Sequence, residues 1–166
     1  LKVPGFSSYI HPLDEGHLLT IGTYVPEDMP QWTGRRIQLS IFDVTDKANP
    51  KLSHSTTLGD SSSYSEAQHN HKAFNYFAAK KLLAVPFSDW GWGQNANGDY
   101  WSSFVSDLRV FQVDTTTGFV AKGAVSMNDL YRVHNYYGWS YYWQPSVRTG
   151  RDGKATILGQ LVNMRD

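Results

Sequence analysis

The chain contains no cysteine, and this absence excludes several classes of protein at once. Without thiols there is no disulfide framework, no cysteine nucleophile and no cysteine-ligated zinc. Charged residues are also scarce, at 18% of the chain, and the 15 Lys and Arg balance the 15 Asp and Glu. Such a balance gives no electrostatic signature for binding nucleic acid or an acidic membrane surface.

Long hydrophobic runs and common enzyme motifs are missing too. No apolar run approaches the roughly 18 residues that a transmembrane helix needs, and G-x-S-x-G, HExxH and the P-loop do not occur. The chain starts at Leu1 without a charged n-region or an apolar h-region. We interpret it as a processed chain or a segment of a longer protein, in which an export signal is no longer present.

Aromatic residues, in contrast, are abundant: they make up 14% of the chain and include 6 Trp and 10 Tyr. Short apolar and β-branched runs alternate with turn-forming residues, which predicts an all-β fold of antiparallel strands. A helical turn is expected only around residues 127–133. The predicted strands are His17–Val25, Arg36–Val44, Lys51–Gly59, Lys81–Phe87, Ser106–Asp114 and Phe119–Val125.

Two parts of the sequence repeat one pattern. Leu39–Gly59 aligns with Leu108–Met127, which pairs Phe42 with Phe111, and upstream Leu18 aligns with Leu82. Tandem units of short strands are typical of propeller blades. We therefore divide the chain into a first blade unit, a second blade unit, and an aromatic connection that opens a third unit; these are residues 1–60, 61–127 and 128–166. Burial is expected for the apolar faces of Leu18–Ile21, Ile37–Ile41, Leu82–Val85 and Leu108–Phe111.

Four motifs, in the same order, resemble those of the secreted bacterial and archaeal β-propeller domain proteins. The resemblance covers Leu1 to about Val125. It implies a propeller that is exported, often lipid-anchored, and without an assigned reaction. The motifs are LKVPGFSSYIHPLDEGHLLTIG, LSIFDVTDKANPKL, SEAQHNHKAF and LRVFQVDTTTGF. The sequence departs from the family pattern at Asn70, where an aspartate is usual, and in the aromatic insertion from Trp90 to Trp101.

The number of blades predicts partners. At this repeat length the chain makes about two and a half blades, whereas propellers usually have four to eight. The terminal units would then expose unpaired strand edges. We expect the remaining blades of the same polypeptide, or another chain, to complete the ring.

His69 and His71 stand one residue apart, directly before an apolar run. In an extended chain both imidazoles face the same way, which suits a divalent metal. Further ligands would have to come from His11, His17, His54, His134 or an aspartate. The simpler interpretation is that His71 starts the inner strand of a blade and fastens it to a neighbouring loop, with His11 at the similar position of the preceding unit. We favour the structural interpretation, and predict no cofactor while keeping the metal site as the alternative.

Two long loops are expected at the same place in the two units, Tyr24–Gly34 and Ser88–Ser103. Equivalent loops of adjacent blades emerge on one side of a ring, so their aromatic residues should lie near one another. Such a platform would bind a glycan or a protein partner; the alternative is that the tryptophans fold back into the core. The candidate binding residues are Trp32, Trp90, Trp92, Tyr100 and Trp101.

Two functional hypotheses follow. The first is a non-catalytic binding or scaffold module of an exported propeller, secreted or associated with the cell envelope. The second is a metal-dependent enzyme, such as a hydrolase, that uses His69 and His71.

Overall fold

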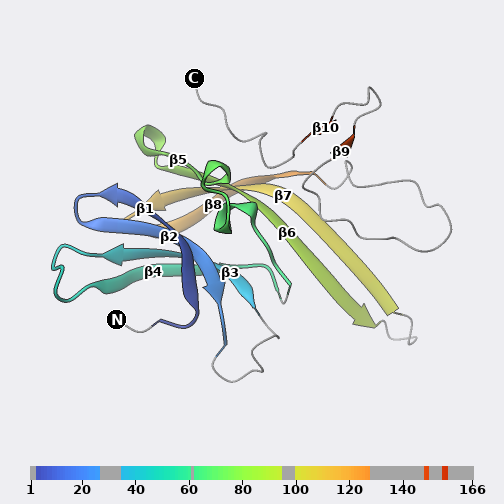
Figure 1. Ribbon diagram of the computed structural model, residues 1–166, viewed down its shortest axis with the longest axis horizontal. Coiled ribbons are helices and arrows are strands. Elements are labelled where there is room, and N and C mark those ends of the chain that lie inside the picture. Colours follow the sequence, from blue (N-terminus) through green and yellow to red (C-terminus); the bar gives the residue numbers. More distant parts are fainter. Residues whose placement is uncertain are drawn as a thin grey trace.

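The computed structural model describes residues 3–26, 35–60, 62–94, 100–127, 148–149 and 155–156, with backbone only for 91–94, 100–104 and the last two segments. Figure 1 shows two four-stranded antiparallel sheets that pack face to face. Sheet 1 has the order β1 (Phe6–Asp14), β2 (His17–Tyr24), β3 (Arg36–Asp43) and β4 (Lys51–Leu58). Sheet 2 has the order β5 (Asn75–Phe77), β6 (Leu82–Gln94), β7 (Tyr100–Asp114) and β8 (Gly118–Ser126).

The remaining described elements are short. The strands β9 (Arg148–Thr149) and β10 (Ala155–Thr156) form an antiparallel pair of their own. Three turns of 3-10 helix flank β5: η1 (Glu66–Gln68), η2 (His71–Ala73) and η3 (Ala78–Lys80). The all-β prediction is confirmed, and helix in the described part of the chain is confined to these turns. The predicted turn at 127–133 lies outside the described residues, apart from Met127.

Aspartates close the turns between neighbouring strands. The carboxylate of Asp43 accepts a hydrogen bond from the Thr45 amide at 2.9 Å, and that of Asp46 accepts one from the Ala48 amide at 3.0 Å. Asp114 does the same for the Thr116 amide at 2.9 Å. Short side chains that bond to the backbone two residues ahead favour turns over continued strands. The FDVTDKANP motif is therefore explained by the β3–β4 turn.

The hydrophobic core lies between the two sheets. Leu19, Ile21, Leu39 and Ile41 of sheet 1 are fully buried, and they face Leu83, Val85, Phe87 and Phe111 of sheet 2. Four predicted apolar segments thus contribute to the core. Only alternate residues of the sheet 2 segments are buried, since Leu82, Ala84, Leu108 and Val110 are partly exposed.

The strand register corrects the repeat alignment by one residue. Phe42 pairs with Leu18 in sheet 1, whereas Phe111 pairs with Leu83, not Leu82, in sheet 2. Leu18 is therefore equivalent to Leu83. A shift of one residue moves a side chain to the opposite face of a strand. With the corrected alignment, the two sheets use opposite faces at their contact. The face of sheet 1 that packs on sheet 2 is equivalent to the face of sheet 2 that points away from sheet 1. This is the arrangement of successive blades in a ring.

Two features were not predicted, and one prediction is wrong. Phe6–Asp14, absent from the predicted strands, is the nine-residue strand β1. Gln38 and Ser40, on the polar face of β3, are 8% and 4% exposed, so β3 is buried on both faces. The segment Ser88–Ser103, expected to be a loop, belongs largely to β6 and β7, which pair from Leu82–Gln112 through to Gln94–Tyr100.

Candidate functional site

The inner edge of sheet 2 is interrupted where that of sheet 1 is continuous. Tyr64 bridges β6 in an antiparallel manner: its amide donates to the Ser88 carbonyl at 2.8 Å, and the Ser88 amide donates back at 2.9 Å. The chain then leaves the edge of the sheet through η1 and η2, and pairing resumes only in β5. The SEAQHNHKAF motif is this interruption.

Ser65 and Gln68 hold the interruption in place. The Ser65 hydroxyl donates to the Pro86 carbonyl at 2.5 Å and accepts from the Ala67 amide, while Gln68 Oε1 accepts from the Ser65 amide at 3.2 Å. Gln68 Nε2 reaches sheet 1, where it donates to the Gly22 carbonyl and to Thr23 Oγ1, both at 3.0 Å. Buried polar groups are stable only when they are hydrogen-bonded in this way. These bonds join the two sheets, and we call them the Gln68 clamp.

The sequence contains a local signal for this clamp. Ser65 and Gln68 form a capping box, whose pattern of serine and glutamine three residues apart can be read from sequence. The contact of Gln68 with sheet 1 has no sequence signal, since it spans 46 residues.

His69 and His71 lie in two different turns of the chain. The chain is not extended here: His69 is the C-cap of η1 and His71 begins η2, so the two side chains are not placed by strand alternation. His71 does not start the inner strand, which begins at Asn75. The His69 ring stacks on Tyr64, with centroids 5.9 Å apart and planes at 27°, and both histidines are exposed.

The register also corrects the proposed similarity between His11 and His71. His11 pairs with Leu19, whose equivalent Ala84 pairs with Asn75, so Asn75 holds the position of His11. The His11 ring lies 5.6 Å from that of Phe74 and 5.5 Å from that of Tyr76. Burial lowers its pKa, because an apolar environment disfavours the charged imidazolium.

The other candidate ligands of a metal are used locally. His17 Nδ1 lies 2.8 Å from Asp14 Oδ1, and His54 Nε2 lies 3.0 Å from the Thr115 carbonyl. His134 lies outside the described residues. Within the described residues, no three histidine or carboxylate side chains come together in a group that could hold a metal ion. A metal at His69 and His71 stays a prediction.

Tyr64 presents an aromatic surface beside the interruption. Its residue is 42% exposed, and its hydroxyl donates to Glu66 Oε2 at 3.0 Å. Partial burial, and next the bond to the Glu66 carboxylate, raise the pKa of Tyr64 to about 12. Tyr64 therefore stays a neutral hydrogen-bond donor at physiological pH. Together with His69 and Glu66, it can make stacking and polar contacts with a ligand.

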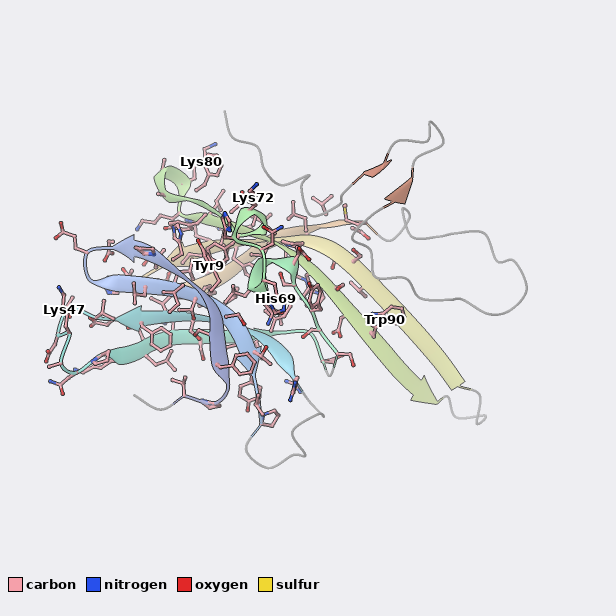
Figure 2. The ribbon with its side chains drawn as sticks, viewed as in Figure 1. Tyr9, Lys47, His69, Lys72, Lys80 and Trp90 are labelled. Carbon is pink, nitrogen blue, oxygen red and sulfur yellow. The ribbon has the colours of Figure 1, made fainter. Side chains whose placement is uncertain are left out.

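The strand β6 after Ser88 and the strand β7 before Ser106 form a two-stranded arm (Figure 1). Within the described residues, each of these two segments has strand pairing only with the other. Figure 2 shows Trp90 along this arm, to the right of His69. Trp90 is partly buried, and its amide donates to Asp89 Oδ1 at 2.9 Å. Trp92 is placed in β6, and Tyr100 and Trp101 in β7, but their side chains lie outside the description, as does all of Trp32.

Asp89 joins the arm to the connection between the sheets. Its Oδ2 accepts a hydrogen bond from the Asp60 amide at 2.8 Å, and the Asp60 carbonyl accepts one from Arg36 Nε at 3.0 Å. The link from β4 to Tyr64 is thus fixed at the base of the arm. In Figure 2 the arm with Trp90 extends to the right of His69, away from Lys47 at the opposite side of the view.

Comparison with known proteins agrees with this arrangement. A family model described as "Beta propeller domain" matches residues 1–154. The chain belongs to the beta propeller domain family. Its two sheets are propeller blades, and because they do not close into a ring, they form part of a propeller. We call them blade 1 (β1–β4) and blade 2 (β5–β8).

Part of the chain is also similar to an archaeal protein. An "Uncharacterized protein" of Archaeoglobus fulgidus is 36% identical over 86 residues, which is 52% of this propeller chain and 12% of that protein. The chain thus spans about an eighth of the length of that relative. No solved structure matches the chain. No helix among the described residues has the length and apolar character required to span a bilayer.

Proposed function

We propose that this chain is part of a non-catalytic binding module in an exported propeller protein, and that its ligand, a glycan or a protein partner, binds at the end that carries the β6–β7 arm. The observation that supports the proposal is the arm itself. Six residues of each strand, 89–94 of β6 and 100–105 of β7, extend beyond the neighbouring strand β8 and beyond the Tyr64 bridge. These twelve residues include three tryptophans.

The composition of the arm favours recognition rather than stability. A strand pair that leaves its sheet buries little apolar surface, yet this one is rich in large aromatic rings. Tyrosine and tryptophan are the side chains that most often carry binding energy, at 2 kcal/mol or more for a central one. The exposed pair of Tyr64 and His69 lies at the base of the arm and would extend the same surface.

The proposed site is tested with a Trp92→Ala/Trp101→Ala double variant. Binding of the unmodified chain to an array of bacterial and archaeal surface glycans, and to immobilised cell-envelope proteins, is compared with that of the variant. We expect binding to be lost while thermal unfolding, followed by circular dichroism, stays cooperative with a similar midpoint. If the variant unfolds or loses cooperativity, the two rings belong to the core and the proposed platform is wrong.

Export is a separate part of the proposal. It is supported by the resemblance to secreted propeller proteins, and it is tested by protease treatment of intact producing cells. Degradation of the protein by an added protease is the expected result, and full protection until lysis would contradict it.

A further inference from the structure

Glu66 holds a carboxylate at the rim of the exposed Tyr64 ring. Its Oε2 accepts the hydrogen bond from the Tyr64 hydroxyl at 3.0 Å, and its Oε1 accepts a weaker one from Asn70 Nδ2 at 3.5 Å. Among the residues that the structure describes, no lysine, arginine or histidine forms an ion pair with Glu66. A carboxylate has about four lone-pair sites, so Glu66 can accept further hydrogen bonds. We call Tyr64 and Glu66 the Tyr–Glu pair.

The position of the Tyr–Glu pair is fixed from several sides. The amide and the carbonyl of Tyr64 are both bonded to Ser88 of β6, at 2.8 and 2.9 Å, and the Tyr64 ring stacks on His69. Glu66 is the first residue of η1, which follows the buried cap residue Ser65. Groups that are ordered before a ligand arrives lose little conformational entropy when it binds. The Tyr–Glu pair is therefore preorganised for a ligand, although both of its residues are accessible to solvent.

Blade 2 contains another aromatic ring beside a carboxylate, and an arginine occupies it. The Arg109 guanidinium lies 3.3 Å from the centroid of the Phe87 ring, and Arg109 Nε lies 3.6 Å from Asp107 Oδ2. A guanidinium is planar and carries its donors in a fork, so it can stack on a ring while it contacts a carboxylate. An ammonium group lacks this plane and this fork. The Tyr–Glu pair offers the same two kinds of group at the surface.

We propose that the Tyr–Glu pair binds an arginine side chain of a protein partner. The guanidinium stacks on the Tyr64 ring and donates hydrogen bonds to the Glu66 carboxylate. This inference rests on the proposed binding function, and it selects a protein with an exposed arginine over a glycan as the ligand. Charge complementarity favours that choice, because a guanidinium neutralises the charge of Glu66, whereas an uncharged sugar leaves it without a counter-charge.

The test titrates the isotope-labelled full chain with a glycine–arginine–glycine tripeptide that is acetylated and amidated at its ends. Binding is followed by NMR through the amide signals of residues 64–70. A second tripeptide carries citrulline in place of arginine, which keeps the shape of the side chain and removes its charge. Glu66→Gln removes the charge of the Tyr–Glu pair and keeps a hydrogen-bond acceptor. Glu15→Gln, at an exposed position of the β1–β2 turn, makes the same change elsewhere and is the matched control.

We expect the arginine peptide to bind the unmodified chain at least about fivefold more tightly than the citrulline peptide. Glu66→Gln should weaken the binding of the arginine peptide by a similar factor, and Glu15→Gln should leave it unchanged. Equal binding of the two peptides, or equal binding to the Glu66→Gln variant and the unmodified chain, would overturn the proposal. So would binding of a neutral cello-oligosaccharide that is lost in Tyr64→Leu and unchanged in Glu66→Gln, because a sugar would then be the ligand of the ring.

The same titration separates this inference from the proposed site on the arm. The tripeptide is too short to need the arm, so its binding should be retained in the Trp92→Ala/Trp101→Ala variant. Retained peptide binding supports the Tyr–Glu pair even if that variant shows the arm platform to be wrong. Loss of peptide binding in a folded Trp92→Ala/Trp101→Ala variant would place the arginine on the arm and overturn the inference.

Discussion

Blade 1 and blade 2 have the same strand order but differ at the inner edge. In blade 1, β1 runs unbroken for nine residues, and its side chains pack directly on blade 2. In blade 2, the edge is divided between the Tyr64 bridge and the three-residue strand β5, and the intervening turns carry Gln68 across to blade 1. A continuous edge strand pairs its backbone with the neighbouring strand along its length, whereas the turns of the interrupted edge place the Gln68 side chain where it reaches the neighbouring blade.

The two blades also differ in the side chains at the centre of equivalent faces. The centre of the outer face of blade 1 holds small polar residues, Thr20 and Ser40, which are buried at 2% and 4% exposure. In blade 2 the equivalents are Val85 and Arg109, and the Arg109 guanidinium lies 3.3 Å from the centroid of the Phe87 ring. Equivalent positions in a repeat thus take different chemistry according to the surface that they meet.

The largest expected effect tests the corrected register between the blades. Leu83→Ala removes a fully buried side chain from the core and should lower the free energy of unfolding by about 2–5 kcal/mol. Leu82→Ala, one residue earlier and on the opposite face of β6, removes a partly exposed side chain and should cost about 1 kcal/mol or less. Urea unfolding followed by circular dichroism measures both. Equal losses would contradict the register that places Leu83, and not Leu82, in the core.

The next effect addresses the interrupted edge. Gln68→Ala leaves the Thr23 hydroxyl and the Gly22 carbonyl without their shared partner and should cost about 1–3 kcal/mol. His69→Ala, on the adjacent exposed residue, is the control and should change stability by less than about 0.5 kcal/mol. A Gln68→Ala variant as stable as the wild type would mean that the clamp does not join the blades.

A smaller effect concerns pH and the continuous edge. Burial lowers the pKa of His11 in the folded chain below its ordinary value of 6.5. The neutral form is thus favoured by folding, so its contribution to stability is complete above about pH 6.5 and is lost as the pH falls through the folded pKa. His11→Phe keeps the aromatic packing and cannot be protonated. We therefore expect the mutant to lose less stability than the wild type between about pH 7 and pH 5, and parallel profiles would contradict this.

The smallest expected effect is on metal content. Purified protein should contain no stoichiometric zinc, copper or iron by elemental analysis, because no described side chain joins His69 and His71 as a third ligand. The His69→Ala/His71→Ala variant should then give the same result. A stoichiometric metal that is lost in the variant would support the alternative function as a metal-dependent enzyme.

Much of the fold could be predicted because its signals are local. Strand propensity located β2, β3, β4 and β8, and the aspartate-containing turns that separate strands are encoded within a few residues. The error in the position of Leu83 has a physical origin. Two adjacent leucines, Leu82 and Leu83, fit either alignment, and only the pairing with Phe111 decides which of them enters the core.

The candidate site was less predictable, because the sequence interpretation was based on residue types that commonly bind metals or ligands, and these are not the residues that connect the blades. His69 and His71 are exposed, while the residues that connect the blades are the chemically ordinary Ser65 and Gln68. The tryptophan-rich segment contains several glycine, asparagine and aspartate residues, which are typical of turns and loops, so the sequence predicts a loop there. Pairing with β7 made it a strand, through backbone hydrogen bonds that the side-chain pattern does not report.

The sequence by itself determined that this protein is built from short antiparallel strands in tandem units, because apolar alternation and turn chemistry act within a single unit. The tertiary structure alone decided which face of each unit meets another blade, how the inner edge of blade 2 is interrupted, and that Gln68 spans the junction. Those features depend on register and on contacts between residues more than 40 positions apart. No local preference specifies them, because a one-residue shift leaves every local pattern intact while it exchanges the buried face for the exposed one.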